Sequence, residues 1–352
     1  MKYVCKIEGK LKWDDPKDLE KMISEIKENK DKITSIELCQ NSIGIECAKI
    51  LGEAISELKN LTSVNYRDLF VSRLKEDLPI SLKYLMEALL NKNIKFIDLS
   101  DNAFGPTAIP SFDFFLKEIK TLEYLELENN GLGPEGAESV CEALLQNNNI
   151  KLKTIKINRN RLENKGGKSL AKVINKMGSI EHLELFQNGI NSEGMEEIFK
   201  SLKNNLNLKI LKLNDNVIKN SCEIFIDVLK NLTKLKILDI SDSIIGNKWG
   251  VELFKVIENL EIEEIYCNYN EIEDKKSQKL ILDSVKKNKN IKILEIKGNE
   301  INKNIYNEYV KEFKNLEKFE CYSEDEENFD EEKEEGDIDE VTKKVDKMNL
   351  NS

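Results

Sequence analysis

The chain has 352 residues, of which 40% are hydrophobic and 34% charged, and its formal net charge is −11. This composition is typical of an ordered chain with a buried core, and no apolar run approaches the roughly 18 residues of a membrane span. The start lacks the apolar segment of a signal peptide, and the seven cysteines are scattered without a C-x-x-C spacing. We therefore expect a reducing compartment, with neither a membrane nor a nucleic acid as partner.

The first 30 residues are predicted to cap the start of a repeat array. Alternating apolar residues in Tyr3–Trp13 indicate an edge strand, and Asp15-Pro16 is a typical helix start, with the helix continuing through Ile26. An array of repeats needs such a cap, because its first unit would otherwise expose its core to water.

One phrase, L-x-x-L-x-L-x-x-N-x-L-x-x-x-G, recurs along the chain and is clearest at Leu122–Gly136. It is similar to the long form of the leucine-rich-repeat signature. From Asn102 to Asn216 the repeat asparagines are 28, 30, 28 and 28 residues apart, and Ser243 replaces one of them later. Such a period predicts a solenoid. The repeat asparagines are Asn41, Asn102, Asn130, Asn160, Asn188, Asn216, Asn270 and Asn299.

Each unit predicts one strand and one helix. The L-x-L alternation indicates a short strand with its leucines inward, and the asparagine turns the chain and satisfies backbone groups of the turn. Apolar residues then follow at helical spacing, as in Ala137, Val140, Cys141, Leu144 and Leu145. The predicted fold is an α/β leucine-rich-repeat solenoid of the ribonuclease-inhibitor-like type, a horseshoe of about 10–11 repeats with parallel strands on the concave face and helices on the convex face.

The second repeat departs from the pattern. Leu69 occupies the place of the asparagine, and an insertion, Phe70–Pro79, precedes the next helix. We expect this charged loop to project from the rim where the strands end, a common place for function. Arg73 is interpreted as functional because the fold is not expected to need a charge there. A tolerated insertion without function is the alternative.

The C-terminal part predicts an end to the solenoid and a separate tail. Leu316–Cys321 could add one last strand. The next stretch, Ser323–Glu340, holds 12 acidic residues and one lysine, a net charge of −11. We therefore predict a leucine-rich-repeat domain over residues 1–322 and an acidic, disordered tail over 323–352.

Signals for intrinsic catalysis are weak. His182 is the only histidine and cannot supply a triad or a histidine-rich metal site. Gly166-Gly167-Lys168-Ser169 resembles the end of a phosphate-binding P-loop, but Leu162 stands where that motif needs glycine. We expect no cofactor, no metal and no nucleotide site, and predict a surface that acts on a partner.

The predicted partner surface combines the strand-end rim with outward-facing strand positions. Most of these positions are acidic, which favours a basic protein partner. The residues singled out for partner binding are Lys75, Asp98, Asp101, Glu128 and Arg159.

Several stretches resemble RanGAP, the GTPase-activating proteins for Ran. They match at positions that the repeat phrase leaves free, and the likeness covers roughly residues 3–340. These stretches are Ile7–Lys10, Phe70–Pro79, Leu99–Ala108, Glu128–Pro134 and Asn158–Asn164.

The resemblance implies roles for three residues. The family's essential loop arginine corresponds to Arg73, and a neighbouring lysine corresponds to Lys75. Its catalytic-site asparagine corresponds to Asn129 at the rim, and not to the repeat residue Asn130. RanGAPs are understood to orient Ran's own glutamine and switch residues without an arginine finger.

The function implied by the resemblance is stimulation of GTP hydrolysis on Ran, in support of nucleocytoplasmic transport. The expected partner is Ran in its GTP form, alone or with a Ran-binding protein, and the expected state is a cytoplasmic, also perinuclear, monomer. Two scaffold classes are the alternatives: an acidic-tailed protein that binds histones or a phosphatase, and a ribonuclease-inhibitor-like protein. The first would have shorter repeats, and the second many more cysteines.

Overall fold

The computed structural model describes residues 3–6, 9 and 11–321, and the chain divides into two compact units, Met1–Ile237 and Leu238–Ser352. The predicted tail, residues 323–352, lies outside the described residues. Within the described part, no helix is both long enough and apolar enough to cross a membrane.

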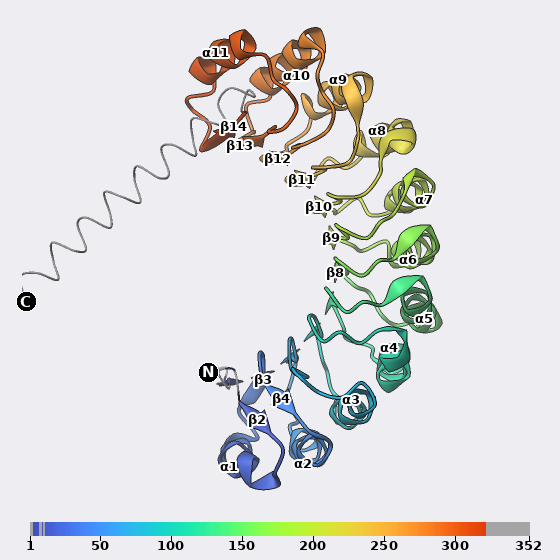
Figure 1. The fold of residues 1–352 in the computed structure, drawn as a ribbon. Helices are drawn as coiled ribbons and strands as arrows, with labels where there is room; N and C mark the ends of the chain where they lie inside the picture. Colours follow the sequence, from blue (N-terminus) through green and yellow to red (C-terminus); the bar gives the residue numbers. More distant parts are fainter. Residues whose placement is uncertain (1–2, 7–8, 10, 322–352) are drawn as a thin grey trace, which may run out of the picture. The chain divides into compact units, whose positions relative to one another are not determined.

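The first unit is a parallel sheet with its strands on the inner face and helices on the outer face (Figure 1). Neighbouring strands pair one repeat apart, so that Leu125 lies between Ile97 and Ile155. The repeat period alone therefore predicts this register. In spatial order the strands are β1 (Tyr3–Lys6), β3 (Ile33–Glu37), β5 (Ser63–Asn65), β6 (Phe96–Asp98), β7 (Tyr124–Glu126), β8 (Thr154–Lys156), β9 (His182–Glu184) and β10 (Ile210–Lys212).

The outer layer of this unit holds one helical segment or pair of segments per repeat. In α5 four residues of the predicted stripe, Ala137, Val140, Cys141 and Leu144, are buried, and the fifth, Leu145, is half-buried. The helical segments are α2 (Ile45–Ser56), α3 (Asp77–Glu87), η2 (Pro106–Ser111), α4 (Asp113–Glu118), α5 (Gly133–Gln146), α6 (Glu163–Met177), α7 (Ser192–Leu202), η3 (Lys219–Ser221) and α8 (Cys222–Leu229).

The stretch Gly166-Gly167-Lys168-Ser169 lies inside helix α6. A Cβ atom on Gly166 would lie 3.0 Å from the Cβ of Ala137, so this glycine allows α5 and α6 to approach closely. The stretch is therefore a helix-packing element and has no P-loop geometry.

The segment predicted to cap the array holds two short strands, where one edge strand was expected, and a helix. β1 pairs in parallel with β3, and β2 (Lys12–Trp13) pairs with β4 (Ser42–Ile43). Asp15 caps the helical segment that follows, because its Oδ1 accepts the backbone N–H of Lys17 at 2.9 Å. This segment comprises η1 (Pro16–Leu19) and α1 (Glu20–Asn29), and it buries Leu19 and Ile26.

The repeat asparagines form a buried ladder, as predicted. Asn130 is fully buried, and its Nδ2 donates to the carbonyl of Leu99 in the preceding repeat at 3.0 Å. Its Oδ1 accepts the backbone N–H of Asn102 at 3.0 Å. The asparagine side chain therefore satisfies backbone groups of two repeats and ties them together.

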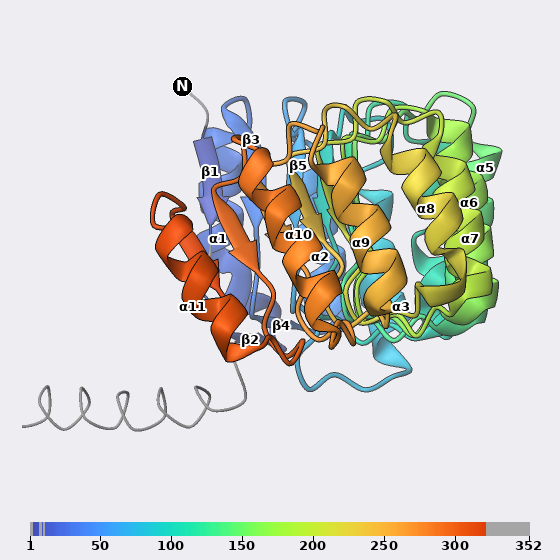
Figure 2. The same ribbon diagram turned by 90° about the horizontal axis from the view of Figure 1, so that it is seen from above.

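The second unit repeats the same plan, with its helices covering the strands (Figure 2). The predicted last strand is confirmed as β14, which pairs in parallel with β13. Ser243, in the place of an asparagine, donates its Oγ to Ser241 O at 3.1 Å. The elements of this unit are β11 (Ile237–Asp239), α9 (Gly246–Ile257), β12 (Glu264–Tyr266), α10 (Lys275–Lys287), β13 (Ile293–Glu295), α11 (Lys303–Glu312) and β14 (Lys318–Glu320).

Candidate partner-binding rim

The residue before each ladder asparagine has a left-handed backbone, with φ of 60° at Asp101, 50° at Asn129 and 58° at Arg159. This conformation is costly for most residues and is best tolerated by glycine, asparagine and aspartate. Four of the seven residues at this position in the first unit are asparagine or aspartate. We call these residues the rim: Gln40, Asp68 (before Leu69, which stands in the place of an asparagine), Asp101, Asn129, Arg159, Gln187 and Asp215.

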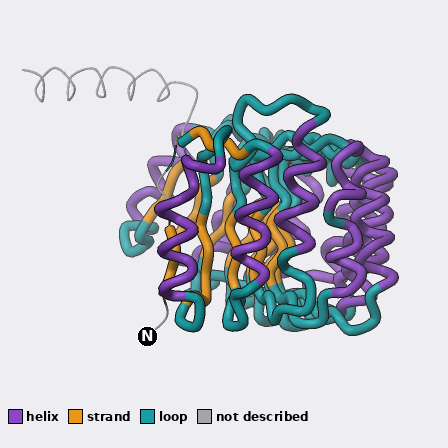
Figure 3. The backbone as a smooth tube through the Cα atoms, turned by 90° about the horizontal axis from the view of Figure 1, so that it is seen from below, coloured by secondary structure: helices purple, strands orange, loops and turns teal. Residues whose placement is uncertain are grey.

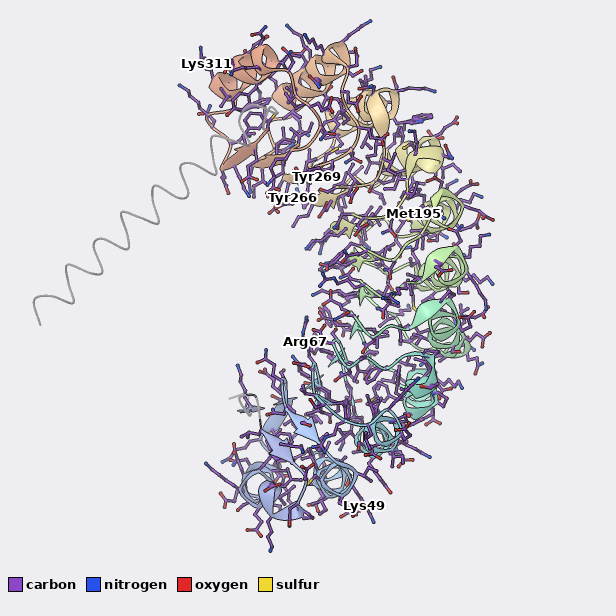
Figure 4. The ribbon with its side chains drawn as sticks, in the orientation of Figure 1. Lys49, Arg67, Met195, Tyr266, Tyr269 and Lys311 are labelled. Carbon is purple, nitrogen blue, oxygen red and sulfur yellow. The ribbon has the colours of Figure 1, made fainter. Side chains whose placement is uncertain are left out.

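Arg67 braces the rim, and the sequence analysis did not single it out. Its Nη2 lies 2.6 Å from Asp101 Oδ2, and its Nη1 lies 3.3 Å from Glu128 Oε2. Because the three residues follow β5, β6 and β7, one guanidinium connects three repeats on the strand side of the unit (Figure 4). The signal available in the sequence was one basic residue, Arg67, at the end of a strand whose following neighbours end in the acidic residues Asp101 and Glu128.

Asn129 is exposed, as expected of a rim residue. Its Nδ2 donates to Asp101 Oδ1 at 2.8 Å, and its backbone N–H donates to Asn158 O at 2.9 Å. The amide is therefore held by its neighbours yet remains accessible to a partner.

Glu128 has a further contact in this network, whereas Arg159 bonds to a rim residue of the next repeat. The Glu128 carboxylate also accepts a hydrogen bond from Asn158 Nδ2, and the exposed Arg159 donates its Nε to Gln187 Oε1 at 2.7 Å. The structure thus brings four predicted site residues together on adjacent repeats. They are Asp101, Glu128, Asn129 and Arg159.

Asp98, which was predicted to bind a partner, offers almost no surface to one in this structure. Its side chain is buried, with 3% of the residue exposed, and its Oδ1 accepts the Ser100 N–H at 2.9 Å. Burial raises the pKa of this carboxyl above its usual range. Asp98 lies in register between Asn65 and Glu126 on the adjacent strands, and closely spaced strands leave little solvent between such residues.

Two acidic residues at outward strand positions of the first unit, Glu126 and Glu184, each pair with a lysine on the next strand. Glu126 pairs with Lys156 at 2.8 Å, and Glu184 pairs with Lys212 at 3.2 Å. His182 lies 2.6 Å from Glu184 Oε1, so the histidine belongs to this network. Although burial opposes it, the hydrogen bond from His182 and the charge of Lys212 lower the pKa of Glu184 to about 2.

The inserted loop projects beyond its neighbours, as predicted (Figures 2 and 3). Its first residues are attached to the first repeat: Phe70 bridges to Ser42, whose Oγ donates to Val71 O at 2.6 Å. Farther along, Leu74 is 66% exposed and Lys75 is also exposed. The loop therefore has an anchored start and a free middle.

Arg73 points into the fold, so the expectation that the fold has no use for its charge was wrong. Its side chain is 11% exposed and pairs with Asp14. Its Nη2 donates to the carbonyls of Ser42 at 2.8 Å and Trp13 at 3.3 Å. The structure does not join Arg73 to Asn129. They follow β5 and β7, and the side-chain contacts of Arg73 lie on the cap and the first repeat, on the other side of β5 from Asn129.

The chain matches the family described as Leucine Rich repeat at residues 119–141, 148–171 and 179–199. By structure it is similar to the crystal structure of the yeast Rad7 and Elc1 complex, with a TM-score of 0.53, 10% identity, and coverage of 80% of this chain and 67% of that one. At that identity the likeness concerns the fold alone. The predicted leucine-rich-repeat solenoid is confirmed.

Two curated relatives are Ran GTPase-activating proteins. Ran GTPase-activating protein 1 of Xenopus laevis is 33% identical over 193 residues, covering 51% of this chain and 33% of the relative. Ran GTPase-activating protein 1 of Saccharomyces cerevisiae is 32% identical over 238 residues, covering 63% and 58%. The chain thus spans about a third to three fifths of these relatives, and the resemblance to RanGAP is confirmed.

Proposed function

We propose that this chain stimulates the hydrolysis of GTP bound to Ran. The similarity to Ran GTPase-activating proteins supports the proposal, and the same relatives give no support to a histone-binding, phosphatase-binding or ribonuclease-inhibitor-like scaffold. The structural observation that carries it is Asn129, an exposed amide held by Asp101 on a rim braced by Arg67.

The mechanism we propose relies on positioning. A small GTPase carries its own phosphates, magnesium and water-orienting glutamine but holds the glutamine loosely. The amide of Asn129 can donate to and accept from such a carboxamide. Because the left-handed backbone and the contact with Asp101 restrict the amide beforehand, little ordering is left for the moment of reaction.

The partner proposed is Ran in its GTP form, bound by this chain as a monomer in the cytoplasm, with neither membrane nor nucleic acid involved. Lys75, Asp101, Glu128 and Arg159 are the proposed contact residues. All four lie on the inserted loop or at the ends of β6, β7 and β8, so that one partner face could meet them together.

Single-turnover phosphate release from Ran loaded with GTP tests the proposal. We expect a large acceleration when the chain is added, and no acceleration of a small GTPase outside the Ran family. Asn129→Gly, which keeps the backbone and removes the amide, is the matched variant and should lose most of the stimulation. An unchanged rate with Ran would refute the proposed function.

A further inference from the structure

We propose that Asp14, in the N-terminal cap, is a positioning residue for the inserted loop and acts through Arg73. The pairing joins residues 59 positions apart in the sequence. Its consequence for GTP hydrolysis rests on the proposed function, whereas its consequence for the loop does not.

Three groups from the cap and the first repeat form a socket for the guanidinium of Arg73. The Asp14 carboxylate binds Nη1, and the carbonyls of Ser42 and Trp13 accept from Nη2 at 2.8 and 3.3 Å. Planar guanidinium donors suit such a set of oxygens, and an ammonium group cannot reproduce the arrangement.

Gly44 supplies the space for this socket. A Cβ atom at position 44 would lie 3.3 Å from Arg73 Nη1 and 3.6 Å from Asp14 Oδ1. Any side chain there would crowd the ion pair. The backbone N–H of Gly44 also donates to Trp13 O at 2.9 Å, which fixes the cap strand against the first repeat.

Asp14 is the charged member of the socket that can be changed without opening a core. Its carboxylate lies 2.9 Å from Lys12 Nζ on its other side. The hydrogen bond from Arg73, followed by that from Lys12, holds the pKa of Asp14 below its usual range. Asp14 therefore stays ionised beside the guanidinium at neutral pH.

The socket determines what the loop presents to solvent. Arg73 is drawn inward, while Leu74 and Lys75 immediately after it are exposed. Without the socket, the segment between Phe70 and α3 would lose its main side-chain anchor and sample many conformations. The cap thus has a second role besides covering the first repeat, because it sets the orientation of the loop.

The test uses the full chain with Asp14→Asn, Arg73→Lys and the double variant. Asp227→Asn removes an exposed pairing of Asp227, in α8, with Lys230 at 2.8 Å, and is the control. Amide hydrogen exchange is followed in Val71–Lys75 and in the ladder. With Ran-GTP, two quantities are measured: the rate of GTP hydrolysis at a saturating concentration of the chain, and the concentration of the chain that gives half of that rate.

We expect loop amides in Asp14→Asn to exchange at least about 10-fold faster, while ladder amides and the control stay unchanged. The saturating rate should fall and the half-saturating concentration rise, and the double variant should be no worse than Arg73→Lys. A loss of folded protein would lower only the active fraction.

Unchanged loop exchange in Asp14→Asn would overturn the socket. Faster exchange with unaltered stimulation would overturn the positioning role. If the unsubstituted chain does not stimulate Ran, the proposed function fails, and the exchange measurement alone then confirms or overturns the control of the loop by the cap.

Discussion

The ladder and the rim occupy neighbouring positions in the same loops, yet different physical constraints determine which residues stand there. Asn130 is fully buried and bonds to the backbone of the preceding repeat, whereas Asn129 is exposed and bonds to a side chain. The stack determines the first residue, because buried carbonyls and N–H groups need a partner. At the second position it restricts only the backbone, so the side chain is available for function.

Arg73 does not fit this division. It belongs to a projecting loop, but its side chain turns inward and contacts Asp14, Ser42 and Trp13, although its buried Nε has no hydrogen-bond partner among the described residues. The comparison teaches that a loop projecting from a solenoid can still be fixed by a side chain that turns back into the fold.

The largest expected effect is that of Arg73→Ala. Stimulated GTP hydrolysis should fall at least about 100-fold, since the loop loses its anchor, a change equivalent to roughly 3 kcal/mol. Arg73→Lys should also be poor, because an ammonium cannot serve the whole socket. Single-turnover rates with Ran-GTP measure both. Full activity in Arg73→Ala would mean that the loop is not part of the active surface.

Asn130→Ala should destabilise the chain by about 1–3 kcal/mol, because it leaves the buried Asn102 N–H without its partner and removes one of the two amide donors to the Leu99 carbonyl. Urea unfolding measures the effect, and the stimulation per folded molecule should be retained. A stability loss as large in Asn129→Gly would erase the distinction between ladder and rim.

Glu184→Gln tests whether a charged residue on the strand face contributes to stability as a ladder asparagine does. The pKa of Glu184 in the folded chain is about 2, below its ordinary value of 4.5, so its contribution is present above pH 4.5 and is lost as the pH falls toward 2. The variant should be less stable by up to about 3 kcal/mol at pH 7, and the difference should vanish near pH 2. Urea unfolding at pH 7, 4 and 3 measures it, and a pH-independent difference would contradict the assignment.

Asn129→Ala should cost about 1 kcal/mol of stability, because alanine tolerates the left-handed backbone less well than asparagine. Asn129→Gly should be neutral within about 0.5 kcal/mol. Both should reduce stimulated hydrolysis about 10-fold or more, because both lack the amide. Thermal unfolding with parallel rate assays separates backbone from side chain, and equal thermal shifts would mean that strain is not the cause.

The smallest effect is expected from a truncated chain ending at Tyr322. Removing the run of net charge −11 should slow association with a basic partner a few-fold at low salt and hardly at all at high salt. Stopped-flow association at two ionic strengths measures this. Identical rates at low salt would exclude steering by the acidic run.

The sequence by itself determined the repeating plan. The period of the asparagines predicted the parallel register, the ladder and the helix stripes, because these follow from local periodicity and from the need to satisfy buried backbone. It also predicted the cap and the strand at Lys318–Glu320. The exposure of Asn129 could be predicted because it directly precedes the buried repeat residue Asn130.

Only the tertiary structure decided what neighbouring repeats do to each side chain. Asp98 alternates outward in sequence, but adjacent strands bury it. Arg67 joins three repeats, and Arg73 turns into a socket that the cap completes. Such contacts join side chains from different repeats and depend on how those repeats stack. The periodicity along the chain carries no information about them.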